Sequence, residues 1–227
     1  MVSDVPPPTT VLTLVFLAWS AGTVVGAATT RMWSEVQAGH FKVLWLLSAV
    51  LSLATGFGYH PAWVLTLACV ITFAAIYRDA DRVIGTAAAA VAIVVLATGS
   101  DLSPQAFAAA ALMGAVTNAM LLGHWHLNQP KLGTKPIARL VVGLWAGVGL
   151  YVAAAAMMTI LSASQGGIRF LAGVTALAFA VFAGVLTAPV HHLVHTRSIM
   201  SATGILYLEI LLCFVAVFTG SVAALMG

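Results

Sequence analysis

Apolar residues are arranged along the chain in eight long runs that are separated by short polar segments. The runs cover residues 11–29, 43–58, 62–76, 83–98, 106–122, 137–161, 170–190 and 199–227. A helix of about 20 apolar residues crosses the ~30 Å hydrocarbon core of a bilayer. The pattern therefore predicts an all-α fold, a polytopic membrane bundle of about eight transmembrane helices. The runs 43–58 and 62–76 are short, so we expect a hairpin that is tilted or crosses incompletely.

The first ten residues differ from the rest because residues 6–8 are consecutive prolines, which disfavour a helix. We predict a proline-rich tail at residues 1–10 and a single transmembrane domain at residues 11–227. The first apolar run is longer than the core of a signal peptide and follows no basic residue. We therefore expect it to be a retained membrane span.

The positions of the basic residues predict the orientation in the membrane. The loops after the first, third, fifth and seventh runs contain Arg31, Lys42, Arg78, Arg82, Lys131, Lys135, Arg139 and Arg197. The loops at the other side contain only Arg169. Because cytoplasmic loops carry an excess of Lys and Arg, the loops with eight basic residues are expected in the cytoplasm. Both termini are then extracytoplasmic.

Composition excludes two classes of protein. With 62% hydrophobic and 7% charged residues, the chain cannot cover the surface of a soluble globular fold. A net charge of +3 from scattered side chains does not form a nucleic-acid surface, so we expect no nucleic-acid partner. Cys69 and Cys213 lie inside apolar runs, where a small buried hydrophobic role is expected.

Histidines gather at the predicted cytoplasmic side and suggest a cofactor site. His191 and His195 are four residues apart, and His192 and His195 three apart, so either pair shares one helix face. Neutral imidazole ligates transition metals and haem iron. We therefore consider His124, His126, His191, His192 and His195 as cofactor ligands, with His191 and His195 as the metal pair and haem b or a transition metal as the cofactor. The alternative is an interfacial, hydrogen-bonding role.

Glu209 is a second candidate because it lies about ten residues, or ~15 Å, inside the last run. A charged carboxylate there costs about 2.5–3.5 kcal/mol, so Glu209 must be protonated, paired or exposed to a polar cavity. The predicted spans offer it no basic partner. We expect a protonated carboxyl that contacts Asn118, Tyr207 or Thr203. Glu209, Asn118 and Tyr207 form the intramembrane polar set of this prediction.

Three further features of the sequence concern helix shape, helix packing and an internal repeat. Pro189 is expected to kink or end the seventh helix just before the histidines. Gly22 and Gly26, like Gly143 and Gly147, have the spacing of small-residue contact faces between membrane helices. Loops 1 and 5 are both long, which makes an internal repeat of four plus four helices conceivable, although no matching motif supports it.

Three functions agree with these features, and no enzymatic reaction is assigned. The first is a membrane redox or haem- or metal-binding subunit. The second is a small proton-coupled transporter that uses Glu209, and the third is a non-catalytic scaffold subunit whose glycine-rich faces pack against other membrane proteins. In each case we expect a multi-pass protein of the cell membrane, specifically a bacterial inner membrane. Its expected partners are the surrounding lipid and either other membrane subunits or further copies of the same chain.

Overall fold

A computed structural model describes residues 6–33, 35–126, 128–129, 131–164 and 166–226. Within these residues the chain forms eight α-helices and one short 3₁₀ helix, η1 (Ile76–Arg78), and no strand. The α-helices are α1 (Pro8–Trp33), α2 (Ala38–Gly56), α3 (Ala62–Ala75), α4 (Asp81–Gly99), α5 (Pro104–Trp125), α6 (Lys135–Ser162), α7 (Gly167–His195) and α8 (Ile199–Leu225).

Seven of these helices, all but α3, are long and apolar enough to cross a membrane, within the described part of the chain. The predicted all-α multi-pass bundle is therefore confirmed. α2 has 19 residues because it begins before its apolar run, whereas α3 has 14 residues and spans only ~21 Å. Many large apolar side chains stay exposed on the bundle surface, as expected for contact with lipid, among them Leu46, Leu67, Leu150, Phe182 and Leu211.

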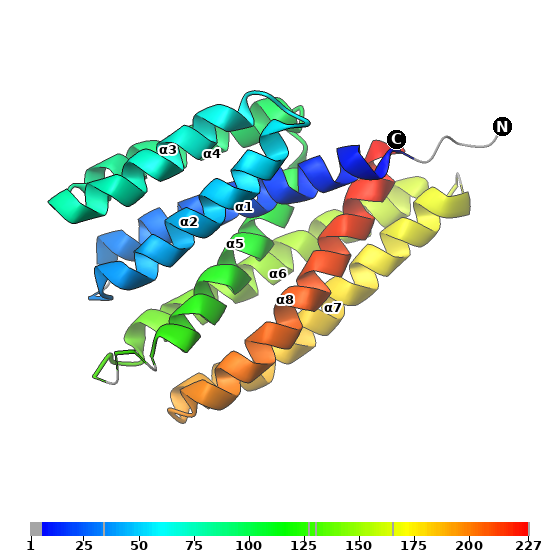
Figure 1. Cartoon of the computed structure of the whole chain (residues 1–227). Coiled ribbons are helices and arrows are strands. Elements are labelled where there is room, and N and C mark those ends of the chain that lie inside the picture. The colour runs from blue at the N-terminus through cyan, green and yellow to red at the C-terminus, as the bar shows by residue number, and fades with distance from the viewer. Residues whose placement is uncertain (1–5, 34, 127, 130, 165, 227) are drawn as a thin grey trace.

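The helices run roughly side by side and alternate in direction, so the loops gather at two ends (Figure 1). At one end lie the loops that follow α1, α3, α5 and α7; we call it the basic end, because it carries the eight Lys and Arg residues named above. The C-terminus, the start of α1 and the other loops lie at the opposite end (Figure 1). That the basic end faces the cytoplasm stays a prediction.

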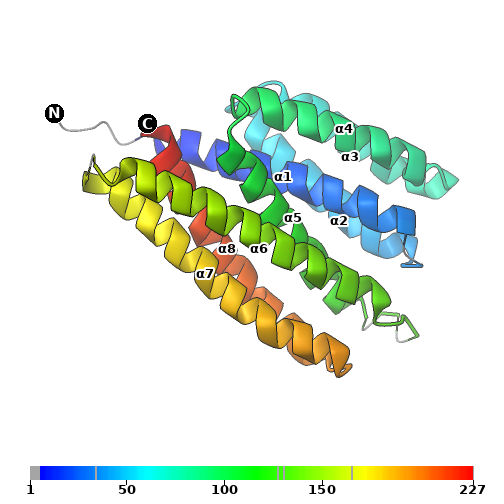
Figure 2. The same ribbon diagram turned by 180° about the vertical axis from the view of Figure 1, so that it is seen from behind.

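The bundle consists of two groups of four helices that make the same internal contacts. In the first group α1 packs on α2, α2 on α3, α3 on α4 and α4 on α1; in the second, α5 to α8 pack in the same order. Figures 1 and 2 show α1–α4 on one side of the molecule and α5–α8 on the other, with α1 and α5 at the boundary. The arrangement agrees with the four-plus-four pattern that the loop lengths suggested.

Glycines allow α1 and α5 to cross in close contact. A Cβ atom on Gly22 would overlap the backbone of Ala110, and one on Gly114 would overlap the backbone of Gly22. Gly26 similarly faces Asn118, and Gly147 faces the backbone of α5. Three of the four glycines that we considered for partner contacts thus pack inside the chain; Gly143 has nothing within 4 Å of its Cβ position.

A buried ion pair fastens α1 to α4 at the basic end. The Nε atom of Arg31 lies 2.7 Å from Oδ2 of Asp81, and its Nη2 donates to Oδ1 at 3.3 Å. The Arg31 guanidinium also lies 5.0 Å from the centre of the Phe41 ring, a cation–π contact. The charged segment between α3 and α4 therefore helps to close the first four-helix group.

Pro189 does not end α7, which continues to His195. Of the two expected outcomes, a kink or a helix end, the helix end is excluded and the kink stays a prediction. Proline removes one backbone hydrogen bond, yet helices in membranes tolerate it when neighbouring helices hold both sides. Here α7 packs along α6 and α8. The histidines that follow Pro189 therefore lie on the helix itself.

Candidate functional site

Glu209 lies at the interface of α7 and α8 and is fully buried. The Thr187 hydroxyl, on α7, donates to its Oε1 atom at 2.6 Å. The second carboxyl oxygen, Oε2, is buried and contacts no hydrogen-bond partner among the described residues. Glu209 also forms no ion pair within the described part of the chain. The site is therefore a single intramembrane carboxyl with one hydroxyl partner.

Thr187 can serve Glu209 in both of its charge states. The Thr187 Oγ1 atom lies 2.6 Å from Glu209 Oε1 and 3.0 Å from the carbonyl oxygen of Ala183. A threonine hydroxyl has one proton and two lone pairs. When Glu209 is ionised, Thr187 donates to the carboxylate; when Glu209 carries a proton, the carboxyl can donate to Thr187, which then donates to Ala183. This exchange allows a proton to come and go without leaving Thr187 unpaired.

The partner of Glu209 differs from those that we expected. Tyr207 is 46% exposed and its hydroxyl lies 3.4 Å from Nδ1 of His124 on α5. Thr203 donates to the backbone oxygen of Ile199 instead. The expectation failed because it considered α5 and α8, whereas Glu209 faces α7. Thr187 is a single threonine in an apolar run, and nothing in the sequence around it indicates that it faces a carboxyl on the next helix.

Beyond Glu209, toward the end opposite the basic end, three side chains with polar atoms, Cys213 of α8, Tyr151 of α6 and Gln105 of α5, lie at the buried face of α8 among apolar residues; we call them the polar line. Cys213, one turn further, is fully buried and free. In the turn after Cys213, the backbone oxygen of Ala216 accepts a 2.7 Å hydrogen bond from the hydroxyl of Tyr151. Beside the Tyr151 hydroxyl lies Gln105, whose amide group is buried.

Gln105 joins this polar line to a pocket at the opposite end. The pocket has a volume of about 370 Å³ and is lined by Gln105, Asp101, Ser103 and Ser221 together with residues of α1 and the α2–α3 turn. A buried amide next to such a pocket is suited to hold water. Sequence reasoning missed Gln105 and Tyr151, because neither spacing nor composition indicates that two separate helices meet at Gly220 of α8.

Asn118 lies at the contact of the two helix groups rather than beside Glu209. Its Nδ2 atom donates to the oxygen of Gly114 at 2.8 Å and to that of Thr23, on α1, at 3.4 Å. Its Oδ1 atom is buried and has no partner among the described residues. Asn118 also lines an apolar pocket of about 300 Å³ between α1, α4, α5 and α6, where Gly143 leaves space.

The structure brings together one pair of the predicted histidine ligands. The Nε2 atoms of His191 and His195 are 3.1 Å apart, and their rings lie on one face at the end of α7. His192 is exposed beside them. No third His, Cys, Asp or Glu of the described chain joins the pair to form a group that could hold a metal. The pair thus offers two ligands, and further ligands would come from water or from another molecule.

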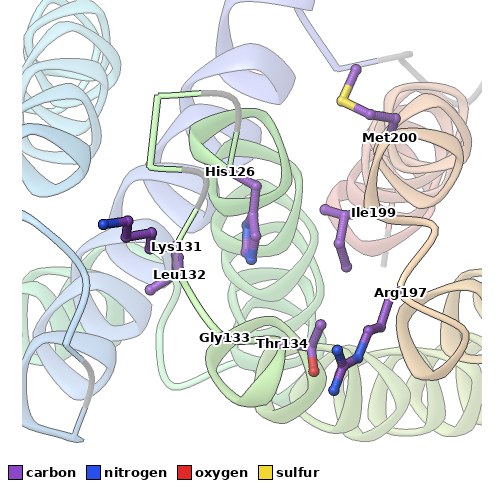
Figure 3. Close-up of a pocket in the computed structure, with 8 residues that line it drawn as sticks. All are labelled: His126, Lys131, Leu132, Gly133, Thr134, Arg197, Ile199 and Met200. Atoms are coloured by element: carbon purple, nitrogen blue, oxygen red, sulfur yellow. The ribbon is translucent and has the colours of Figure 1, made fainter.

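The histidines of α5 have other surroundings. His124 is exposed and contacts Tyr207. His126 lies where α5 ends; its Nδ1 is 2.9 Å from the oxygen of Leu122, and its buried Nε2 has no partner in the described chain. Figure 3 shows the His126 ring at a pocket that the α7–α8 turn also lines. His40, buried at the start of α2, packs on Phe41 and on the Trp125 ring.

No family model, no curated protein and no solved structure matches this chain. The function of this protein is therefore inferred from its own residues.

Proposed function

We propose that this protein is a small proton-coupled membrane transporter in which Glu209 takes up and releases the proton. The observation that carries the proposal is the environment of this carboxyl: it is fully buried, bonded to Thr187 and without a cationic partner in the described chain. Ionisable residues inside membrane spans are costly, and they mark proton relays and ion pathways. A carboxyl without a fixed cation can lose and regain a proton without breaking a salt bridge.

The polar line toward the end opposite the basic end supports an entry route for the proton. Gln105 lies at a pocket of about 370 Å³, Tyr151 of α6 donates to the Ala216 oxygen of α8, and Cys213 lies one turn from Glu209. Water that enters from the pocket could bridge these polar groups by hydrogen bonds. Toward the basic end, Leu206 is the next buried side chain of α8, and Thr203 follows it. The pocket at Gln105 supports access from the end opposite the basic end.

Access from the other side requires a change of conformation, and Pro189 offers a place for it. Pro189 lies two residues beyond Thr187 on α7, where the missing backbone hydrogen bond allows the helix to bend. The two four-helix groups resemble the parallel halves of transporters that move against each other. In such proteins the substrate site lies between the halves. The apolar pocket of about 300 Å³ beside Asn118 is suited to this role.

The test is proton flux into liposomes that contain the purified protein. With an imposed membrane potential and a trapped pH-sensitive dye, wild-type protein should acidify the vesicles, and Glu209→Gln should reduce the rate to that of protein-free vesicles. Glu35→Gln is the matched control, because it removes a carboxyl at the exposed basic end. Equal flux in wild type and Glu209→Gln would contradict the proposal, as would no flux in the wild type.

Infrared difference spectra provide a measurement that needs no transported substrate. Titration of the wild-type protein should show the C=O band of a carboxyl that gains a proton within the apolar core. That band should be absent from Glu209→Gln and present in Glu35→Gln. If the band persists in Glu209→Gln, another carboxyl carries the proton and the assignment to Glu209 fails.

The His191–His195 pair favours a second candidate function, the binding of a transition metal at the basic end. Two imidazoles one turn apart on one helix face can bind a single ion. The Nε2 atoms of this pair are 3.1 Å apart, within hydrogen-bond distance of each other. A haem b held by two histidines would draw them from two helices, whereas His191 and His195 lie on one, so we favour zinc, copper or nickel here.

Titration with Zn²⁺ or Cu²⁺, followed by calorimetry and elemental analysis, tests this second candidate on protein that carries no histidine tag. His191→Ala and His195→Ala should each reduce the metal affinity at least tenfold, since each removes one of two ligands. His192→Ala is the matched control, because this neighbouring histidine is outside the pair. Wild-type affinity in His195→Ala would exclude the site.

A further inference from the structure

A pocket at the basic end is lined by charged side chains that have no role in either candidate function. It has a volume of about 570 Å³ and lies between the end of α5, the α5–α6 loop and the start of α8. Thr134 and Arg197 both line it, and Figure 3 shows these two side chains next to each other below the His126 ring, with the Lys131 side chain directed away from Arg197. An adjoining pocket of about 440 Å³ shares Arg197 and Thr134 and extends to Lys135 and Arg139.

The lining of the two pockets is strongly cationic. Four of the lining side chains are Lys131, Lys135, Arg139 and Arg197, and Glu35 is the one acid among the described lining residues. Each of these four lies within a few residues of a helix end, at the level where a membrane helix meets the headgroup region. The positive charge is therefore concentrated at the depth of lipid phosphates.

Two helices also point their N-termini toward this space. α6 begins at Lys135 and α8 at Ile199, and both residues line the pockets. No side chain caps the first turn of either helix. The N-terminus of a helix carries about half a positive charge and free backbone N–H groups, so it attracts anions.

The remaining lining residues give the pocket a mixed polar and apolar wall. The His126 ring lines it from the end of α5, with its Nε2 atom buried. Leu132, Ile199 and Met200 line the same pocket and add an apolar wall.

From these features we propose that the pocket binds the phosphate group of an anionic phospholipid. Arg197 and the neighbouring Lys135 neutralise the phosphate, and the N-terminal N–H groups of α6 and α8 donate to its oxygens. The apolar wall accommodates the glycerol and the first part of the acyl chains. The same cations would also attract inorganic phosphate, so the test must separate the two sources.

Native mass spectrometry of the protein with phosphatidylglycerol in mild detergent tests the proposal. Removal of one cation from such a site weakens the binding of an anionic headgroup about fivefold. Arg197→Gln should show this loss, and Arg197→Lys should keep most of the affinity. Arg82→Gln is the matched control, since Arg82 is exposed at the same end, at the start of α4, and lines neither of the two pockets. An unchanged melting temperature of lipid-free Arg197→Gln confirms that the variant folds.

Titration with inorganic phosphate, alone and in competition with phosphatidylglycerol, separates the sources. Lipid binding that phosphate does not displace supports a lipid site; displacement supports a phosphate site that accepts either source. Equal loss of phosphatidylglycerol in Arg197→Gln and Arg82→Gln would overturn the proposal, because a general surface charge would then explain the binding. Failure of the wild type to bind either probe would do the same.

Discussion

The crossing of α1 and α5 holds the two four-helix groups together, and replacing Gly114 with alanine tests it directly. The added Cβ would overlap the backbone of Gly22 and lie 2.8 Å from its Cα. Nonbonded carbon atoms at optimal contact are about 3.5–4.0 Å apart. The helices must therefore separate by about 1 Å, and they cannot relax through a rotamer change because the clash is with backbone.

Overpacking of this kind costs about 1–3 kcal/mol, from which the better helix propensity of alanine subtracts about 0.5–1 kcal/mol. The net loss is up to about 2.5 kcal/mol, which should lower the melting temperature of a chain of this size by up to about 10 °C. Gly143→Ala is the matched control, since its Cβ has nothing within 4 Å. There only the gain in propensity applies, so this variant should be as stable as the wild type or more stable.

The assay is thermal unfolding of both variants in one detergent, followed by circular dichroism and by the monodisperse fraction on size exclusion. The reasoning fails if Gly114→Ala melts at or above the temperature of Gly143→Ala. That result would mean that the two helix groups are not in contact at Gly22, and the boundary between the groups would then need a different description.

Three further outcomes follow from buried contacts. Asp81→Asn should cost about 3–5 kcal/mol, because it leaves Arg31, which is 13% exposed, without its charge partner; the double change Arg31→Met with Asp81→Leu should recover much of this loss in a double-mutant cycle. Tyr151→Phe should cost about 1 kcal/mol through the lost bond to Ala216 and should also slow proton flux, whereas a purely structural tyrosine would leave the flux intact. Cys69 and Cys213 are fully buried, so a maleimide should label the folded protein slowly and the denatured protein at both thiols.

Glu209 illustrates how far the sequence leads toward a site. Its depth in an apolar run indicates an unusual carboxyl, because a charge in hydrocarbon is costly wherever the helix packs. Its partner depends on which neighbouring helix faces that side of α8, and this is Thr187 of α7. The histidines show the same limit: four-residue spacing on one helix predicts the contact of His191 with His195, but it does not show that the His124 ring contacts Tyr207.

The sequence by itself determined the class of the protein, the positions of its helices and the accumulation of basic residues at one end. These features depend on local properties, since the length and hydrophobicity of each run decide whether it crosses a membrane as a helix. Only the tertiary structure decided that the eight helices form two similar groups and that α1 and α5 cross at Gly22 and Gly114. It also placed Gln105 and Tyr151 over Gly220, and Arg197 beside the start of α6. Such contacts join residues that are far apart in the chain. In an apolar bundle they depend on the shapes of whole helix faces, and a short sequence pattern does not predict those shapes.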